Sequence, residues 1–174
     1  MNFGLLIIGD AKKFNVKYNP QFYTKEISLK ANKIIYDILF LGQNKKREEK
    51  ILKIKYNLNK KFLKTNFIIV KKEKDFIKYS DYLELLSKSR CILDYNQEGQ
   101  KGLSLRPLES LFFEKKLITN NKDIQNYDFY NKDNIFILGI DNMDNIEEFI
   151  NKPYTKIDRK IIDRYEFKNW LSRF

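Results

Sequence analysis

Residues 91–121, which read CILDYNQEGQKGLSLRPLESLFFEKKLITNN, decide the fold. The two ends of this stretch, residues 91–93 and 116–119, have the short apolar character of buried parallel strands. Between them, a polar loop with two glycines leads into a segment that begins at Ser104, a residue type that favours N-cap positions, and carries Pro107 in its first turn. The stretch therefore predicts a strand, a loop, a helix and a second strand.

The same alternation continues on both sides of this stretch. We expect further strands at the apolar runs 36–41, 67–70 and 135–138. Further helices are expected from a basic start at 45–47, after a cap at Ser80, and around 145–150 and 165–174; the apolar positions of the first are Ile51, Leu52, Ile54, Leu58 and Phe62. Alternating strands and helices require right-handed crossovers, so we predict an α/β fold, a Rossmann-like open parallel sheet with helices on both faces. We assign this domain to residues 31–174 and a linker-like segment to residues 1–30.

The composition favours one folded domain with an anionic partner. The chain has 174 residues, and its 34 Lys and Arg against 23 Asp and Glu give a net charge of +11. That excess fits a nucleic acid, an acidic membrane surface or a phosphorylated ligand. An alternative explanation of the positive charge is that lysine is the common surface residue of this chain, without a specific anionic partner.

Several classes of chemistry are disfavoured by the residues that the chain lacks. It has no histidine and a single cysteine, Cys91, inside an apolar run, which argues against Ser-His-Asp or Cys-His catalysis, an ordinary zinc site and an internal disulfide. Asp141 and Asp144 fit a solvated helix start better than a metal cluster. The apolar run 3–8 is too short for a signal peptide or a membrane span, so we expect a cytoplasmic protein.

Polar groups follow the carboxyl ends of the predicted strands, where open parallel sheets bind ligands. They are residues 42–47, Tyr79 and Ser80, residues 97–104, and Asn120 with Asn121. All four groups can face one cleft. The start of a helix attracts phosphate through its free N–H groups, and an acid one turn further in can accept hydrogen bonds from a ribose, so a nucleotide or nucleotide sugar fits.

Two plainer explanations remain open for these residues. Arg106 and Glu109 are spaced to pair on a helix surface, without any ligand. Gly42 followed by Lys45 and Arg47 lacks the dinucleotide fingerprint and the Walker A pattern, and is also consistent with a turn glycine before a solvated basic helix. The loop glycines beside Arg106 and Glu109 favour the ligand interpretation there.

Residues 98–109, EGQKGLSLRPLE, resemble bacterial glycosyltransferases of the GT-B fold, in a group associated with lipopolysaccharide and capsule synthesis. The resemblance extends from about residue 10 to the C-terminus. It includes KYNPQFY at 17–23, FLGQ at 40–43, LITNN at 117–121, YDFY at 127–130 and the closing segment 165–174.

This resemblance implies the donor-binding, C-terminal half of a two-domain enzyme whose substrate is a nucleoside-diphosphate sugar and which needs no metal or cofactor. Glu109 matches the family's ribose-binding glutamate, and the preceding loop and helix start face the diphosphate. Arg106 and Arg47 are the candidate catalytic residues, because they would stabilise the leaving nucleoside diphosphate. The candidate substrate-binding residues are Gly42, Gln43, Lys45, Tyr79, Gln97, Glu98, Gly99, Gly102, Leu103, Ser104 and Glu109.

Two departures from the family pattern matter. Glu98 and Glu109 lie farther apart than the paired glutamates of the commonest retaining enzymes, and the acceptor-binding N-terminal domain is missing. A partner domain or subunit would have to supply that half. The alternative function is a non-catalytic basic Rossmann-like module that binds nucleic acid or an anionic membrane surface, including peripheral contact with the inner membrane. Phe40, Phe62 and Phe67 lie within apolar patterns rather than among basic residues, which argues against nucleic acid. A third interpretation is a phosphosugar enzyme of another class on the same fold.

Overall fold

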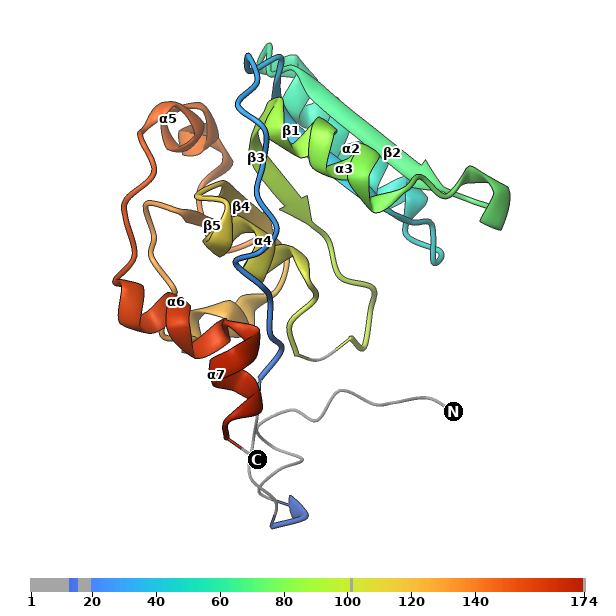
Figure 1. The fold of residues 1–174 in the computed structure, drawn as a ribbon. Helices are drawn as coiled ribbons and strands as arrows, with labels where there is room; N and C mark the ends of the chain where they lie inside the picture. The colour runs from blue at the N-terminus through green and yellow to red at the C-terminus, as the bar shows by residue number, and fades with distance from the viewer. Residues whose placement is uncertain (1–12, 16–19, 101, 174) are drawn as a thin grey trace.

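A computed structural model describes residues 13–15, 20–100 and 102–173 of the chain (Figure 1). Within them lies a five-stranded sheet of order β2-β1-β3-β4-β5, in which all neighbouring strands are parallel. The strands are β1 (Tyr36–Gln43), β2 (Thr65–Val70), β3 (Ser89–Asp94), β4 (Lys116–Thr119) and β5 (Ile135–Ile137). The predicted α/β fold and all the predicted strands are confirmed.

Helices cover both faces of this sheet, as predicted. They are α2 (Glu48–Lys60), α3 (Tyr79–Ser87), α4 (Arg106–Phe112), α5 (Ile146–Asn151), α6 (Arg159–Tyr165) and α7 (Phe167–Leu171), with short 3-10 turns at Glu73–Asp75, Lys122–Asn126 and Met143–Asn145. Successive residues of a strand point to opposite faces, so each strand contributes to two cores. In β3, Ile92 packs with α3, α4 and α6 on one face, while Cys91 and Leu93 pack with α2 and α5 on the other.

The strand order reverses between β1 and β3. From β1 the chain crosses to β2 at one edge, and from β3 it proceeds through β4 to β5 at the other edge. The crossovers on the two sides of this point diverge, which leaves a crevice outside the carboxyl ends of β1 and β3. Asp94 ends β3 there, and Gln43 ends β1. A ligand site is therefore expected between the loops that follow these two strands.

Part of the segment before β1, which we assigned to a linker, packs against the core of the domain. Tyr23 is 5% exposed, stacks edge-on against Phe112 and Phe113, and forms an isolated parallel bridge with Glu166. Ile27 and Leu29 pack against the same core. Figure 1 shows this blue segment running from α7 past α4 to the start of β1. The residues before 13, residues 16–19 and Lys101 lie outside the described parts of the chain, so the expectations for the runs 3–8 and 17–19 are not addressed.

Several predicted helix details were wrong. α3 begins at Tyr79 with Lys78 as its N-cap, so Ser80 lies inside the helix, and α4 has Leu105 rather than Ser104 at the N-cap. Leu52 is 46% exposed and Phe62 is 95% exposed beyond the end of α2, because the helix buries only Ile51 and Leu58 deeply. The closing segment forms two helices, since Glu166 adopts an extended conformation between α6 and α7.

Candidate functional site

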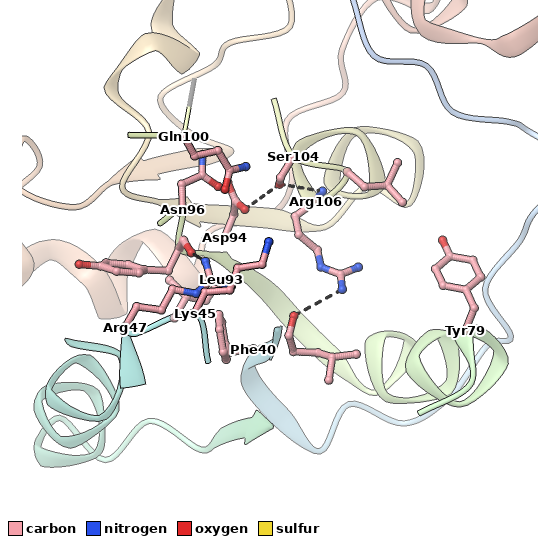
Figure 2. Close-up of a pocket in the computed structure, with 13 residues that line it drawn as sticks. Phe40, Lys45, Arg47, Tyr79, Leu93, Asp94, Asn96, Gln100, Ser104 and Arg106 are labelled. Atoms are coloured by element: carbon pink, nitrogen blue, oxygen red, sulfur yellow. Dashed lines mark hydrogen bonds between the residues drawn. The ribbon is translucent and has the colours of Figure 1, made fainter. Parts of the chain in front are cut away.

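A cavity of about 310 Å³ opens at the strand-order reversal, outside the carboxyl ends of β1 and β3 (Figure 2). Its lining comes from four places: the end of β1 and the turn after it, the start of α3, the end of β3 and its following loop, and the start of α4. The lining residues are Phe40, Leu41, Lys45, Arg47, Tyr79, Leu93, Asp94, Tyr95, Asn96, Gln100, Ser104, Leu105 and Arg106. Three cations and one carboxylate give the cavity a positive lining, which suits an anionic ligand.

Arg106 enters the cavity from the first residue of α4. Its guanidinium donates to Glu109 at 2.5 Å through Nη1 and to the Leu41 carbonyl at 3.4 Å through Nη2, and lies 4.0 Å from the centre of the Tyr82 ring. Burial by itself would lower the pKa of Arg106. The net shift is upward, because nearby charges, Glu109 and Asp94 among them, outweigh the effect of burial. Arg106 is thus a fixed cation with its orientation set from three sides.

Glu109 lies beneath Arg106 rather than in the cavity. Its side chain is fully buried, and its two oxygens accept hydrogen bonds from Tyr79 at 2.9 Å, Tyr82 at 2.8 Å and Arg106. Tyr79 is also hydrogen-bonded to Tyr23, which ties the N-terminal segment to this network. In this structure Glu109 is fully buried and holds Arg106 in place, and the expected ribose contact stays a prediction.

Arg47 enters the cavity from the opposite side, just before α2. Its Nε donates to the Gln43 carbonyl at 3.2 Å, its Nη1 donates to the Tyr95 carbonyl, and its guanidinium lies 5.8 Å from the centre of the Phe40 ring. Burial lowers the pKa of Arg47, although arginine stays protonated at neutral pH. The bond to Tyr95 links the turn after β1 to the loop after β3.

Gly42 makes room for Arg47. A Cβ at this position would lie 2.9 Å from Arg47 Nη2 and 3.0 Å from Cζ of Phe40, closer than side chains tolerate. The absence of a Cβ therefore lets the guanidinium approach the backbone closely, and a side chain here would displace it. Gly42 lies against Arg47 and does not line either cavity of the cleft, so its assignment as a substrate-binding residue stays a prediction.

The turn after β1 carries two lysines in an unusual backbone conformation. Lys45 and Lys46 have φ values of 40° and 60°, in the left-handed region that glycine favours. Asn44 closes the turn, because its carbonyl accepts from the Arg47 N–H at 2.9 Å and its side chain accepts from the Glu48 N–H at 3.1 Å. Such conformations concentrate at functional sites, where the surrounding structure holds them.

Asp94 is a site residue that sequence reasoning missed. It ends β3, is 4% exposed, and accepts hydrogen bonds from Ser104 at 2.7 Å and Thr119 at 3.1 Å. Burial raises the pKa of Asp94, although these hydrogen bonds, with Arg106 and Arg47, oppose the shift. Its signal in the sequence was a carboxylate directly after the apolar run 91–93, at the carboxyl end of a strand.

A second cavity of about 520 Å³ adjoins the first. The two cavities share Lys45, Arg47, Tyr95 and Asn96, so they form one cleft with these residues between them. The remaining lining residues of the second cavity are Lys46, Lys50, Gln97, Glu98 and Asn120. This cavity too has more cations than carboxylates.

The other predicted site residues divide into those near the cleft and those away from it. Gln97 and Glu98 line the second cavity, and Tyr79, Lys45 and Ser104 line the first. Gly99 and Gly102 have φ values of 78° and 81°, which shape the loop around the cleft without lining it. Leu103 is a core residue at 4% exposure, and Gln43 lines another hollow beside β2, so neither lines the cleft and their substrate contacts stay predictions.

Within the described residues, no cluster of three or more Cys, Asp and Glu side chains is arranged to hold a metal ion. In the same parts of the chain, no helix combines the length and the apolar character that a membrane span needs.

Comparisons with known proteins found no relative. No protein-family model matches the chain, and it matches no curated protein and no solved structure. The fold and the site therefore rest on the geometry described above, and any family assignment stays a prediction.

Proposed function

We propose that the chain is a donor-binding domain of a glycosyltransferase, and that its cleft binds the diphosphate of a nucleoside-diphosphate sugar. The observation that carries this proposal is the convergence of Arg47 and Arg106 on one cavity from opposite sides of the strand-order reversal. Guanidinium groups suit phosphate oxygens because their N–H groups form planar, directed pairs. The resemblance of residues 98–109 to enzymes of lipopolysaccharide and capsule synthesis supports a role in cell-surface polysaccharide synthesis.

The cleft has the charges that glycosyl transfer needs at the leaving group. In this reaction an acceptor hydroxyl attacks the anomeric carbon, the bond from that carbon to the diphosphate oxygen breaks, and the diphosphate gains negative charge. Arg47, Arg106 and Lys45 line the cavity where that charge would develop. Cations already fixed at that position stabilise the transition state without further reorganisation, and no metal is required by the proposal.

The acceptor side of the reaction is assigned to another domain or subunit. The transfer requires the acceptor oxygen, the anomeric carbon and the leaving group to be held together, and the described residues form one wall of such a site. We therefore expect this chain alone to bind the donor and to turn it over slowly or not at all. A cytoplasmic location and peripheral contact with the anionic inner membrane belong to the same proposal.

A thermal-shift screen tests the proposal. The purified chain is heated with UDP, GDP, CMP, their sugar conjugates or a short nucleic acid, since a ligand that binds the native state raises the melting temperature. We expect stabilisation by one nucleoside diphosphate, lost in Arg47→Ala and Arg106→Ala but kept in Arg159→Ala, an exposed arginine of α6. Silence with every nucleotide, together with salt-sensitive binding to nucleic acid, would instead favour the basic binding module.

A further inference from the structure

Asn96 has a buried donor that the described protein leaves unused. The residue is 7% exposed and lines both cavities of the cleft, yet its Nδ2 finds no hydrogen-bond partner among the described residues. Buried polar groups are nearly always paired, and an unpaired amide in a native structure calls for an explanation. Figure 2 shows Asn96 beside Asp94 and Gln100 on one side of the cavity.

The position of Asn96 is fixed by its backbone rather than its side chain. The side chain of Asn120, directly after β4, accepts from the Asn96 N–H at 2.7 Å and donates to the Asn96 carbonyl at 3.1 Å. This two-point contact joins the loops that follow β3 and β4. The Asn96 side chain therefore lies at the junction of the cavities with its backbone held, and its buried Nδ2 has no partner among the described residues.

Cations surround this junction on both sides. The first cavity has Lys45, Arg47 and Arg106, and the second has Lys45, Arg47, Lys46 and Lys50. The single carboxylate that lines the second cavity, Glu98, has a side chain that is 95% exposed and lies 3.9 Å from Lys50. An amide donor within a positive lining suits an anionic oxygen better than a neutral one.

We propose that the second cavity is a second phosphate subsite in which Asn96 donates a hydrogen bond to a phosphate oxygen. A diphosphate then spans the cleft, with one phosphate between Arg106 and Arg47 and the other beyond Asn96, and Arg47 contacts both. This inference rests on the proposed function, and it adds a preference for diphosphates over monophosphates together with the residue that creates it.

The test compares inorganic phosphate with pyrophosphate by calorimetry at one low salt concentration. The unaltered chain is expected to bind pyrophosphate at least about tenfold more tightly than phosphate, because the second phosphate gains its own contacts. In Asn96→Ala, the affinities for pyrophosphate and phosphate should differ by no more than about twofold. The affinity for phosphate itself should stay within about twofold of its original value. Asn96→Asp, which places a carboxylate at the junction, should weaken pyrophosphate further.

A readout of stability separates this binding role from a structural one. Asn96→Ala keeps the backbone contacts with Asn120 and removes an unpaired buried donor, so its melting temperature without ligand should equal or exceed that of the unaltered chain. Asn151→Ala, an exposed asparagine that ends α5, is the matched control and should change neither ratio nor stability.

The possible results distinguish a failure of the second subsite from a failure of the proposed function. An unchanged ratio in Asn96→Ala, or an equal loss for phosphate and pyrophosphate, overturns the second subsite. If pyrophosphate binding then still depends on Arg106, the proposed function survives that failure. Absence of binding by either probe to the unaltered chain overturns the subsite and the proposed diphosphate site together.

Discussion

Arg106 and Glu109, one helical turn apart, form an ion pair in which the carboxylate is fully buried and the guanidinium reaches the cavity. Tyr79 and Tyr82 complete the hydrogen bonding of the carboxylate. The buried carboxylate of Glu109 thus fixes the orientation of the partly exposed guanidinium of Arg106. A surface pair at this spacing contributes a few tenths of a kcal/mol, whereas breaking a buried pair costs several.

Glu109→Gln should destabilise the protein strongly. The amide keeps the size of the carboxylate but leaves Arg106 without its counter-charge, so we expect the free energy of unfolding to fall by about 3 kcal/mol. Urea unfolding measures this change, with Glu114→Gln, an exposed glutamate that follows α4, as the control. A loss below about 0.5 kcal/mol in Glu109→Gln would show that the pair contributes no more than a surface contact.

Gly42→Ala should weaken anion binding through Arg47. The new methyl group would displace the guanidinium from above Gly42, so affinity for a nucleoside diphosphate should fall nearly as far as in Arg47→Ala. The φ angle of Gly42 is outside the left-handed region, so alanine adopts this backbone conformation and stability should change by less than about 1 kcal/mol. Calorimetry on both variants checks this prediction, and full affinity in Gly42→Ala would refute the role assigned to the contact.

Asp94→Asn should strengthen anion binding several-fold at neutral pH. The change removes the carboxylate of the first cavity, which repels a phosphate, while asparagine still accepts from Ser104 through Oδ1. Weaker binding in Asp94→Asn would contradict the view that Asp94 opposes the ligand's charge.

The same substitution should change how stability depends on pH. Burial raises the native pKa of Asp94 above the ordinary value of 3.8, so at pH values between the unfolded and the native pKa the native state retains a proton that the unfolded chain has released. Stability contributed by this group is therefore present below the unfolded pKa and is lost as the pH rises through the native pKa. Urea titrations at a series of pH values should show this decline in the unaltered chain and a smaller one in Asp94→Asn.

Lys46→Gly should stabilise the fold while it weakens binding. Lys46 has a φ of 60°, and a left-handed conformation costs a residue other than glycine about 1 kcal/mol, so the free energy of unfolding should rise by up to that amount. Lys53→Gly, in the interior of α2, removes the same charge and should destabilise by about 1 kcal/mol. If urea unfolding showed that both substitutions change the free energy of unfolding in the same direction, the strain at Lys46 would not be significant.

The sequence predicted the sheet because its strands are continuous apolar runs that alternate with helical patterns. The docking of Tyr23 was not predictable in this way, since the segment around it has no helix or strand periodicity and its partners Phe112 and Phe113 are distant in the chain. The positions of Arg47 and Arg106 in one cleft followed from the rule that loops after parallel strands meet. The contact between Asn96 and Asn120 depends on how the loops after β3 and β4 are aligned, which composition does not encode.

The central claim is that Arg47 and Arg106 bind the same diphosphate, and a double-mutant cycle measured by calorimetry tests it most directly. Affinities for the nucleoside diphosphate that stabilises the chain are measured for the unaltered protein, Arg47→Ala, Arg106→Ala and the double variant. Each single variant should lose at least about tenfold in affinity, and the losses should not add, because both arginines contact one ligand. Full affinity in both single variants would contradict the claim.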